Sequence, residues 1–192
     1  MIAIIKYNGG NVNSVQNALN RLGAESIITD DLELIKNADK VIFPGVGEAS
    51  STMKILKEKE LDQLIPTLKQ PVLGICLGMQ LMCKNSEEGN TLGMGIFDIN
   101  VKKFPSENIV PHMGWNTISD FKSNIFYGIE ENEDVYFVHS FYCELSENTS
   151  SVCNYILPFS ASLQKDNFYA MQFHPEKSGE IGSRLLENFL KL

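Results

Sequence analysis

The sequence has few cysteines and no long apolar run. Four cysteines occur in 192 residues, and none lies in a Cys-x-x-Cys pair or at the spacing of zinc ligands. A chain of this length does not need disulfides to fold. No apolar stretch approaches the ~18 residues that cross a bilayer, and the first residues carry no basic segment of the signal-peptide kind. We therefore expect a reduced, cytoplasmic protein that uses no metal, no cofactor and no membrane.

Basic residues are scarce as well. Lys and Arg total 16 against 24 Asp and Glu, which gives a formal net charge of -8. This balance argues against nucleic acid or an anionic membrane as the main partner. The sequence lacks repeats, low-complexity tracts and Pro/Ser-rich linkers. Its length suits one globular domain with a real core, so we expect a single domain over residues 1–192.

Short apolar runs alternate with helical patterns through the first half of the chain. Strands are expected at residues 2–5, 26–28, 40–43 and 71–75, and helices at residues 14–22, 32–37 and 48–68. Alternation of strands and helices is typical of a parallel sheet wrapped by helices.

From Leu92 onward the pattern changes to short β-type segments separated by turns. These segments are residues 96–101, 115–118, 134–138, 151–156, 160–163 and 168–173. Because the connections are too short for crossover helices, much of this half should be antiparallel. Residues 181–190 then form a closing helix with one apolar face. The predicted fold class is α/β: an open mixed, mostly parallel sheet flanked by helices, with an antiparallel C-terminal part.

The stretch Gly74-Ile75-Cys76-Leu77-Gly78 lies between an expected strand and a helical segment at residues 79–83. Gly-x-Cys-x-Gly in this position resembles a nucleophile elbow with sulfur in place of a serine oxygen. Glycine at both flanks relieves the crowding around a strand that reverses into a helix. The partial positive charge of a helix N-terminus favours the nucleophilic thiolate. The alternative is a buried structural cysteine beside two packing glycines.

The loop Pro44-Gly45-Val46-Gly47 directly follows the third expected strand. In doubly wound sheets, ligands bind beyond the carboxyl ends of the strands. Because Val46 stands between two glycines, a peptide here can turn its N–H toward a bound carbonyl, or away from it, at little steric cost. We interpret the loop as one side of an oxyanion hole, with the Leu77 N–H as the second donor. A tight turn without a function is the alternative.

His174 ends an expected strand and is followed by Pro175 and Glu176. Pro175 biases His174 toward an extended backbone, in which residues two apart point the same way. Glu176 is then placed to fix the tautomer of the imidazole and to stabilise the imidazolium. We predict Cys76, His174 and Glu176 as nucleophile, base and orienter of an acyl-transfer site. Taken alone, the His-Pro-Glu motif is also compatible with a surface turn that has no function.

Two further features have open assignments. His139 ends a strand, and it either lines the pocket or is a satisfied structural histidine. Trp115, in Pro111-His112-Met113-Gly114-Trp115-Asn116, is either an exposed interface anchor or a core residue. Cys83 is most simply a small packing residue.

The segments Gly74–Gln80 and Gln172–Glu176 together resemble the motifs of triad (class I) glutamine amidotransferases. Within that family, Pro44–Gly47, Pro111–Asn116 and His174–Ser178 resemble the glutaminase subunits of imidazole glycerol phosphate synthases, which act in histidine biosynthesis. The resemblance covers essentially the whole chain. It implies a flavodoxin-like open mixed sheet flanked by helices, in agreement with the pattern above.

The resemblance also implies a mechanism. Cys76 would attack the side-chain amide of L-glutamine, His174 would protonate the departing ammonia and then activate water, and Glu176 would orient His174. The amides of Val46, between Gly45 and Gly47, and of Leu77 would hold the oxyanion, with Val46 swinging into place only when the partner is engaged. The family positions that hold glutamine are matched by Gln80, Glu88, His139, Ser140 and Phe141.

A heterodimer is implied as well. The ammonia would pass into the barrel of a cyclase subunit, where it would react with a ribulosyl imidazole-carboxamide ribonucleotide. Trp115, Asn116 and Lys177 match the face that the family turns to the cyclase. One segment departs from the family, since Lys6-Tyr7-Asn8-Gly9-Gly10-Asn11 stands where Asp-Tyr-Gly-x-Gly-Asn is common. Two alternatives therefore remain: a glutaminase for another synthase, making pyridoxal phosphate or aminated surface sugars, and a non-catalytic docking or redox-sensing homologue.

Overall fold

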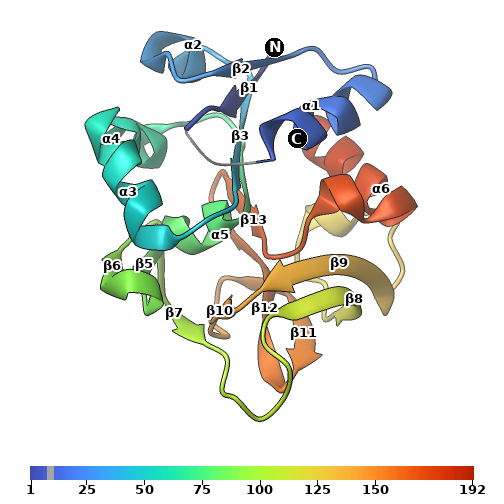
Figure 1. Ribbon diagram of the computed structural model, residues 1–192. Coiled ribbons are helices and arrows are strands. Elements are labelled where there is room, and N and C mark those ends of the chain that lie inside the picture. Colours follow the sequence, from blue (N-terminus) through green and yellow to red (C-terminus); the bar gives the residue numbers. More distant parts are fainter. Residues whose placement is uncertain (8–10) are drawn as a thin grey trace.

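The computed structural model describes residues 1–7 and 11–192. Figure 1 shows a long twisted sheet with helices on both of its faces and a smaller group of strands beside it. The turn expected at residues 6–11 falls partly on residues 8–10, which lie outside the described residues. Within the described ranges, no helix has the length and apolar character needed to cross a membrane.

The large sheet contains nine described strands in the order β2-β1-β3-β4-β13-β12-β11-β8-β9. Their bounds are β1 Ile2–Ile5, β2 Ser26–Thr29, β3 Lys40–Gly45, β4 Val72–Cys76, β8 His112–Ser119, β9 Glu133–His139, β11 Thr149–Tyr155, β12 Leu157–Lys165 and β13 Phe168–Met171. Neighbours from β2 to β13 pair in parallel, and neighbours from β13 to β9 pair antiparallel. The expected mixed sheet with an antiparallel C-terminal part is confirmed, and its two halves meet at β13.

The helices follow the expected pattern with one interruption. They are α1 Val12–Arg21, α2 Leu32–Lys36, α3 Ala49–Glu58, α4 Leu61–Leu64, α5 Leu77–Met82 and α6 Gly179–Leu190, with the 3-10 turns η1 Ile65–Thr67, η2 Glu88–Asn90, η3 Asn124–Phe126 and η4 Pro175–Lys177. The helical region expected over residues 48–68 is present, but it is divided into α3, α4 and η1, because Glu60 adopts a left-handed conformation with φ 58°.

A second sheet was not expected from the sequence. It has the order β10-β7-β5-β6, with β5 Cys83–Ser86, β6 Thr91–Leu92, β7 Phe97–Lys103 and β10 Phe141–Cys143. Only β7 corresponds to an expected strand. The helical segment expected through Cys83 ends at Met82, and the chain turns there into β5. The other strands of this sheet are short, so they carry little periodic signal.

Successive residues of the parallel strands pack on opposite faces of the sheet. In β1, Ala3 and Ile5 belong to the core that includes residues of α2, α3, α4 and α5. Ile2 and Ile4 belong to the core that includes residues of α1 and α6. The closing helix α6 buries its predicted apolar face, which includes Leu185, Leu186 and Phe189.

The carboxyl ends of β3, β4 and β13 lie side by side. Gly45 at the end of β3 pairs with Cys76 at the end of β4, and Ile75 pairs with Met171 at the end of β13. This register brings the Pro44–Gly47 loop, the cysteine elbow and the segment carrying His174 to one edge of the sheet.

Candidate active site

Cys76 forms the sharp turn between β4 and α5. Its backbone has φ 53° and ψ -110°, a strained conformation for a residue with a side chain. This geometry is the strand-to-helix elbow expected from the sequence. The side chain is nearly buried, and Sγ lies 3.9 Å from the carbonyl oxygen of Val138.

The two glycines of the elbow are needed for space. A Cβ on Gly78 would lie 2.0 Å from the carbonyl oxygen of Phe43 in β3. A Cβ on Gly74 would lie 3.1 Å from the backbone of Gly78 and 2.8 Å from Sδ of Met82. The expected crowding is present. At Gly78, however, it comes from the neighbouring strand, and the backbone strain is carried by Cys76 itself.

His174 follows β13, and its ring is held by Glu176. Nδ1 of His174 lies 2.8 Å from Oε1 of Glu176, and both side chains are almost fully buried. The reason for the contact differs from the expected one. His174 is extended, but residues Pro175–Lys177 form the turn η4, which brings the carboxylate back onto the ring. Nδ2 of Asn11 also donates to Oε1 of Glu176, at 3.3 Å.

The other ring nitrogen of His174 faces the nucleophile. Nε2 is buried and has no conventional hydrogen-bond partner among the described residues. Burial lowers the pKa of His174, but the hydrogen bonds and negative charges of Cys76 and Glu176 raise it, and the net result is a pKa raised to about 10. Because Nδ1 is occupied by Glu176, the effect of Cys76 acts at Nε2. The imidazole therefore lies between a sulfur and a carboxylate.

A cavity of about 360 Å³ opens over Cys76 and His174. Its other lining residues are Val46, Gly47, Leu77, Gln80, Glu88, Pro111, Val138, His139, Ser140 and Phe141. The structure thus brings nearly all of the predicted substrate and oxyanion residues around one cavity, and adds Pro111 and Val138. Gly45 is packed behind it, since a Cβ there would lie 2.7 Å from the Gly78 nitrogen.

Two of the predicted substrate residues already bind protein groups. Nε2 of Gln80 donates to the Phe141 carbonyl at 3.0 Å and to Oε1 of Gln172 at 2.9 Å. Oε2 of Glu88 accepts from the N–H of Ala49 at 2.9 Å, at the start of α3. Burial raises the pKa of Glu88, and the N–H of Ala49 opposes that rise.

His139 and His112 form a buried pair whose hydrogen bonds run in one direction. Nδ1 of His139 lies 2.7 Å from the Phe141 carbonyl oxygen, so this nitrogen carries the hydrogen. Its Nε2 accepts from Nδ1 of His112 at 2.9 Å, and Nε2 of His112 accepts from Nδ2 of Asn116 at 3.2 Å. Burial lowers the pKa of His112 to about 4 and that of His139 to about 3. Both rings are neutral at neutral pH, and His139 is a pocket residue as well as a satisfied buried histidine.

The two predicted oxyanion donors have different surroundings. Leu77 lines the cavity as the first residue of α5, where N–H groups have no helical partner. Near Val46 lies the buried hydroxyl of Tyr7, which donates to the Pro44 carbonyl at 2.7 Å. Burial and the charge of Cys76 raise the pKa of Tyr7 well above its ordinary value, and the backbone of Val46 lowers it. Tyr7 is not among the described residues that line the cavity.

Gln172 is a site residue to which the sequence assigned no role. It is fully buried, and its Nε2 lies 3.6 Å from Sγ of Cys76. The only signal in the sequence was its place two residues before His174. Its contact with the sulfur depends on the pairing of β13 with β4, which is a long-range feature.

The predicted partner residues share an exposed surface beside η4. Trp115 is 58% exposed, so the core interpretation is wrong. Its ring packs edge-on against Tyr136 with centroids 6.1 Å apart, and Nζ of Lys177 lies 5.8 Å from the centroid of the same ring. Asn116 lies on the same strand as Trp115, and its amide reaches inward to His112.

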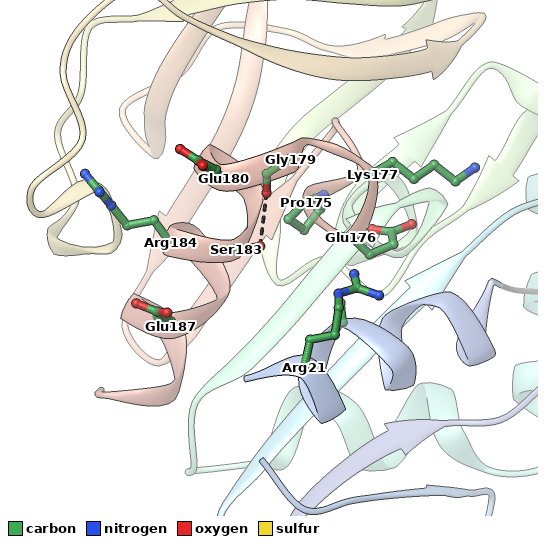
Figure 2. A pocket seen from close by; sticks show the side chains of 10 residues that line it. Arg21, Pro175, Glu176, Lys177, Gly179, Glu180, Ser183, Arg184 and Glu187 are labelled. Carbon is green, nitrogen blue, oxygen red and sulfur yellow. Dashed lines mark hydrogen bonds between the residues drawn. The ribbon is translucent and has the colours of Figure 1, made fainter. Parts of the chain in front are cut away.

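Figure 2 shows a second hollow, of about 570 Å³, on the outer side of η4 and α6. Its lining includes Arg21, Lys177 and Arg184 together with Glu180 and Glu187. The guanidinium of Arg184 is bound to the carbonyl of Gly128 at 2.6 Å. The reactive sulfur and imidazole belong to the smaller cavity, so the chemistry belongs there as well.

Comparison with known proteins is consistent along the whole chain. The family model described as glutamine amidotransferase class-I matches residues 3–192. The imidazole glycerol phosphate synthase subunit HisH of Bacteroides fragilis (strain YCH46) is 62% identical over 194 residues, which cover 100% of this chain and 99% of the relative. The protein of the same name from Escherichia coli (strain K12) is 45% identical, with the same coverage of both chains.

A solved structure shows the same fold at much lower identity. A putative GMP synthase component of Thermoplasma acidophilum has a TM-score of 0.77 with 20% identity, and the match covers 100% of this chain and 92% of that chain. The arrangement of strands and helices described above is therefore shared with a distant protein.

Proposed function

The chain belongs to the class-I glutamine amidotransferase family, and from that premise we propose that it is the glutaminase subunit of imidazole glycerol phosphate synthase, which supplies ammonia to a cyclase subunit. Identity of 62% over the full length of a protein with that name supports the assignment. The observation that carries it is the buried His174–Glu176 pair, 2.8 Å apart, whose histidine lines one cavity together with Cys76. The proposal treats residues 1–192 as one glutamine amidotransferase domain that works in the cytoplasm.

In the first half-reaction, the Cys76 sulfur attacks the side-chain amide carbon of glutamine. His174 takes the thiol proton and gives it to the departing nitrogen, so that ammonia leaves and a glutamyl thioester remains. Glu176 accepts from Nδ1–H and stabilises the imidazolium between these two transfers. The raised pKa of His174, about 10, means that at neutral pH the ring holds this proton until the nitrogen departs.

In the second half-reaction, water attacks the thioester carbon. His174 removes a proton from the water and returns it to the sulfur, which leaves as the Cys76 thiol while glutamate forms. The oxyanion of both tetrahedral states is held by backbone N–H groups. Leu77 supplies one of them at once, and Val46 supplies the other after its peptide rotates away from Tyr7.

The substrate is held along the remaining lining of the cavity. Glutamine contacts are assigned to Gln80, Glu88, His139, Ser140 and Phe141, all of which line it. The neutral state of His139 fits this role, because a ring that is already hydrogen-bonded on both nitrogens presents a fixed wall. The cyclase is assigned to the surface of Trp115, Asn116 and Lys177, where an exposed indole and an ammonium group lie together.

The alternatives from the sequence have weaker support. A redox sensor or a docking protein does not need a carboxylate that orients a buried imidazole. No observation among the described residues favours a glutaminase that serves a synthase of pyridoxal phosphate or of aminated surface sugars. The histidine-pathway glutaminase is therefore the assignment to test.

The test is co-purification with a candidate cyclase, followed by measurement of glutamate release. If the Val46 peptide rests toward the Tyr7 hydroxyl, as proposed, the lone chain should hydrolyse glutamine slowly. Loss of one oxyanion donor costs about 10²–10³ in rate, so adding the cyclase and its nucleotide ligand should raise turnover by that order. Absence of glutamate release in the complex would refute the glutaminase assignment. Full activity of the lone chain would refute the proposal that the Val46 N–H reaches the oxyanion only when the cyclase is bound.

A further inference from the structure

Gln172 joins the wall of the glutamine pocket to the nucleophile. It directly follows β13, its side chain is fully buried, and its N–H donates to the Ala161 carbonyl at 2.8 Å. Its side-chain oxygen lies 2.9 Å from Nε2 of Gln80, and its Nε2 lies 3.6 Å from Sγ of Cys76. A buried amide in contact with a reactive sulfur calls for a physical role.

The orientation of this amide follows from the network around it. The Phe141 carbonyl can only accept a hydrogen bond, so the atom of Gln80 that lies 3.0 Å from it is the nitrogen. The same nitrogen lies 2.9 Å from one amide atom of Gln172, which must then be the oxygen. The nitrogen of Gln172 is consequently the atom that faces Cys76. A flipped amide would set two NH₂ groups against each other.

We propose that Gln172 is a positioning residue whose side-chain N–H donates to the Cys76 thiolate and holds the sulfur in line for attack on the substrate amide. The inference rests on the proposed function. The sulfur also lies 3.9 Å from the Val138 carbonyl, an acceptor that favours the protonated thiol. The amide of Gln172 favours the anion instead, because a hydrogen bond to the charged form stabilises that form.

The titratable groups around Cys76 come from several elements. They are His174 before η4, Tyr7 after β1 and Cys143 in β10, each of which interacts electrostatically with Cys76. Gln172 carries no charge, so replacing it by another neutral side chain changes a hydrogen-bond donor and leaves the charges of this group as they were. A shift in the behaviour of the sulfur is then attributable to the lost donor.

The experiment compares Gln172→Glu and Gln172→Met with the wild-type chain, each in complex with the cyclase. The carboxylate of Gln172→Glu still accepts from Gln80 but donates nothing to the sulfur, whereas Gln172→Met loses both contacts. The readout is the rate of alkylation of Cys76 by iodoacetamide as a function of pH, assigned to that residue by peptide mass spectrometry. We expect the midpoint of the profile to move to higher pH in both variants, and further in Gln172→Glu. At neutral pH the rate should fall about tenfold, as for a lost hydrogen bond to a charged group, and recover at alkaline pH.

Gln164→Met is the matched control, since Gln164 is a half-buried glutamine in β12 whose Nε2 donates to the Tyr169 hydroxyl, at 3.4 Å. It should alkylate as the wild type does. A wild-type profile in the neutral variant Gln172→Met would overturn the proposal, because the amide would then have no effect on the sulfur. If Gln172→Met does not fold, as judged by thermal unfolding, the neutral variant Gln172→Leu takes its place, since the charge of Gln172→Glu disfavours the thiolate by itself.

Glutamate release separates this inference from the proposed function. In both Gln172 variants kcat should fall. KM for glutamine should stay unchanged in Gln172→Glu, which keeps the contact with Gln80, because the donor acts on the sulfur and not on the bound substrate. A wild-type complex that releases no glutamate would refute the glutaminase assignment, while the alkylation profile would still test Gln172.

Discussion

The cavity over Cys76 has two unlike walls. The first, which we call the fixed wall, consists of Cys76, Gln80, His139, Gln172 and His174. Its members are buried and are joined by hydrogen bonds to one another or to the backbone. The second, which we call the loop wall, is Val46 and Gly47, where Val46 is 39% exposed and lies on a loop near the Tyr7 hydroxyl. The reacting groups lie in the interior, and the adjustable donor lies on the surface.

The physical difference between the walls explains this division. Groups held by a packed, hydrogen-bonded interior need no reorganisation when charge develops on the substrate. A donor on an exposed loop rotates at small cost, because few packed neighbours have to move with it. An enzyme that must release ammonia only when its partner can take it gains from placing the chemistry in the first wall and the control in the second.

Removing the nucleophile from the fixed wall should have the largest effect. Cys76→Ala should abolish glutamate release, since loss of a nucleophile of this kind costs on the order of 10⁶ in rate. Synthesis driven by added ammonium salt should persist in the complex, because the cyclase reaction does not use the thiol. Both activities are measured in the same complex, with Cys153→Ala in β11 as the control. Loss of both would show that the chemistry is not divided between the two chains as proposed.

Freeing the loop wall should have a smaller effect of opposite sign. Tyr7→Phe removes the hydroxyl that acts on Val46 and Pro44 but keeps the ring, whose centroid lies 5.7 Å from that of Phe43. Because a neutral hydrogen bond contributes about 1 kcal/mol, glutamine turnover by the lone chain should rise about fivefold, and activation by the cyclase should shrink accordingly. Turnover is compared with that of Tyr127→Phe, an exposed tyrosine remote from the cavity. An unchanged rate in Tyr7→Phe would mean that the hydroxyl does not restrain the donor.

The third effect should appear in stability rather than in rate, and it concerns the fixed wall together with His112, which is hydrogen-bonded to His139. Burial lowers the pKa of His112 from 6.5 to about 4 and that of His139 from 6.5 to about 3. The unfolded chain therefore binds more protons once the pH falls below 6.5, and the free energy of unfolding decreases from there toward pH 4. His174 acts in the opposite direction, because its raised pKa of about 10 gives stabilisation that is complete below pH 6.5 and is lost as the pH rises toward 10.

Thermal unfolding as a function of pH measures both changes in stability. In His112→Gln the loss of stability between pH 6.5 and pH 4 should become smaller, while the loss toward pH 10 should remain as in the wild type. A loss at acid pH as large as in the wild type would contradict its assignment to the histidine pair.

Much of the site was predictable because its main parts directly follow strands. The elbow at Cys76, the loop at Val46 and the motif at His174 each come after an apolar run, and the carboxyl ends of parallel neighbours meet at one edge. Local patterns therefore gave the reactive groups and the parallel half of the sheet.

The parts that were missed depend on contacts between distant segments. The roles of Gln172 and Tyr7 require the register of β13 on β4 and the packing of β1 beside β3. The His112–His139 pair requires β8 and β9 to place these two residues opposite each other. The second sheet was missed because β5 is short and polar in its middle, with Lys84 and Asn85 exposed.

The fit around Gly78 limits how this protein can change over generations. Any Cβ at this position would overlap the Phe43 carbonyl, at 2.0 Å. Every missense change in a glycine codon adds at least a methyl group, so each would force α5, which begins at Leu77, away from β3 and the Val46 segment that follows it. A lineage that keeps its histidine pathway must therefore keep glycine at position 78. In a saturation library grown without histidine, only synonymous codons should survive at that position.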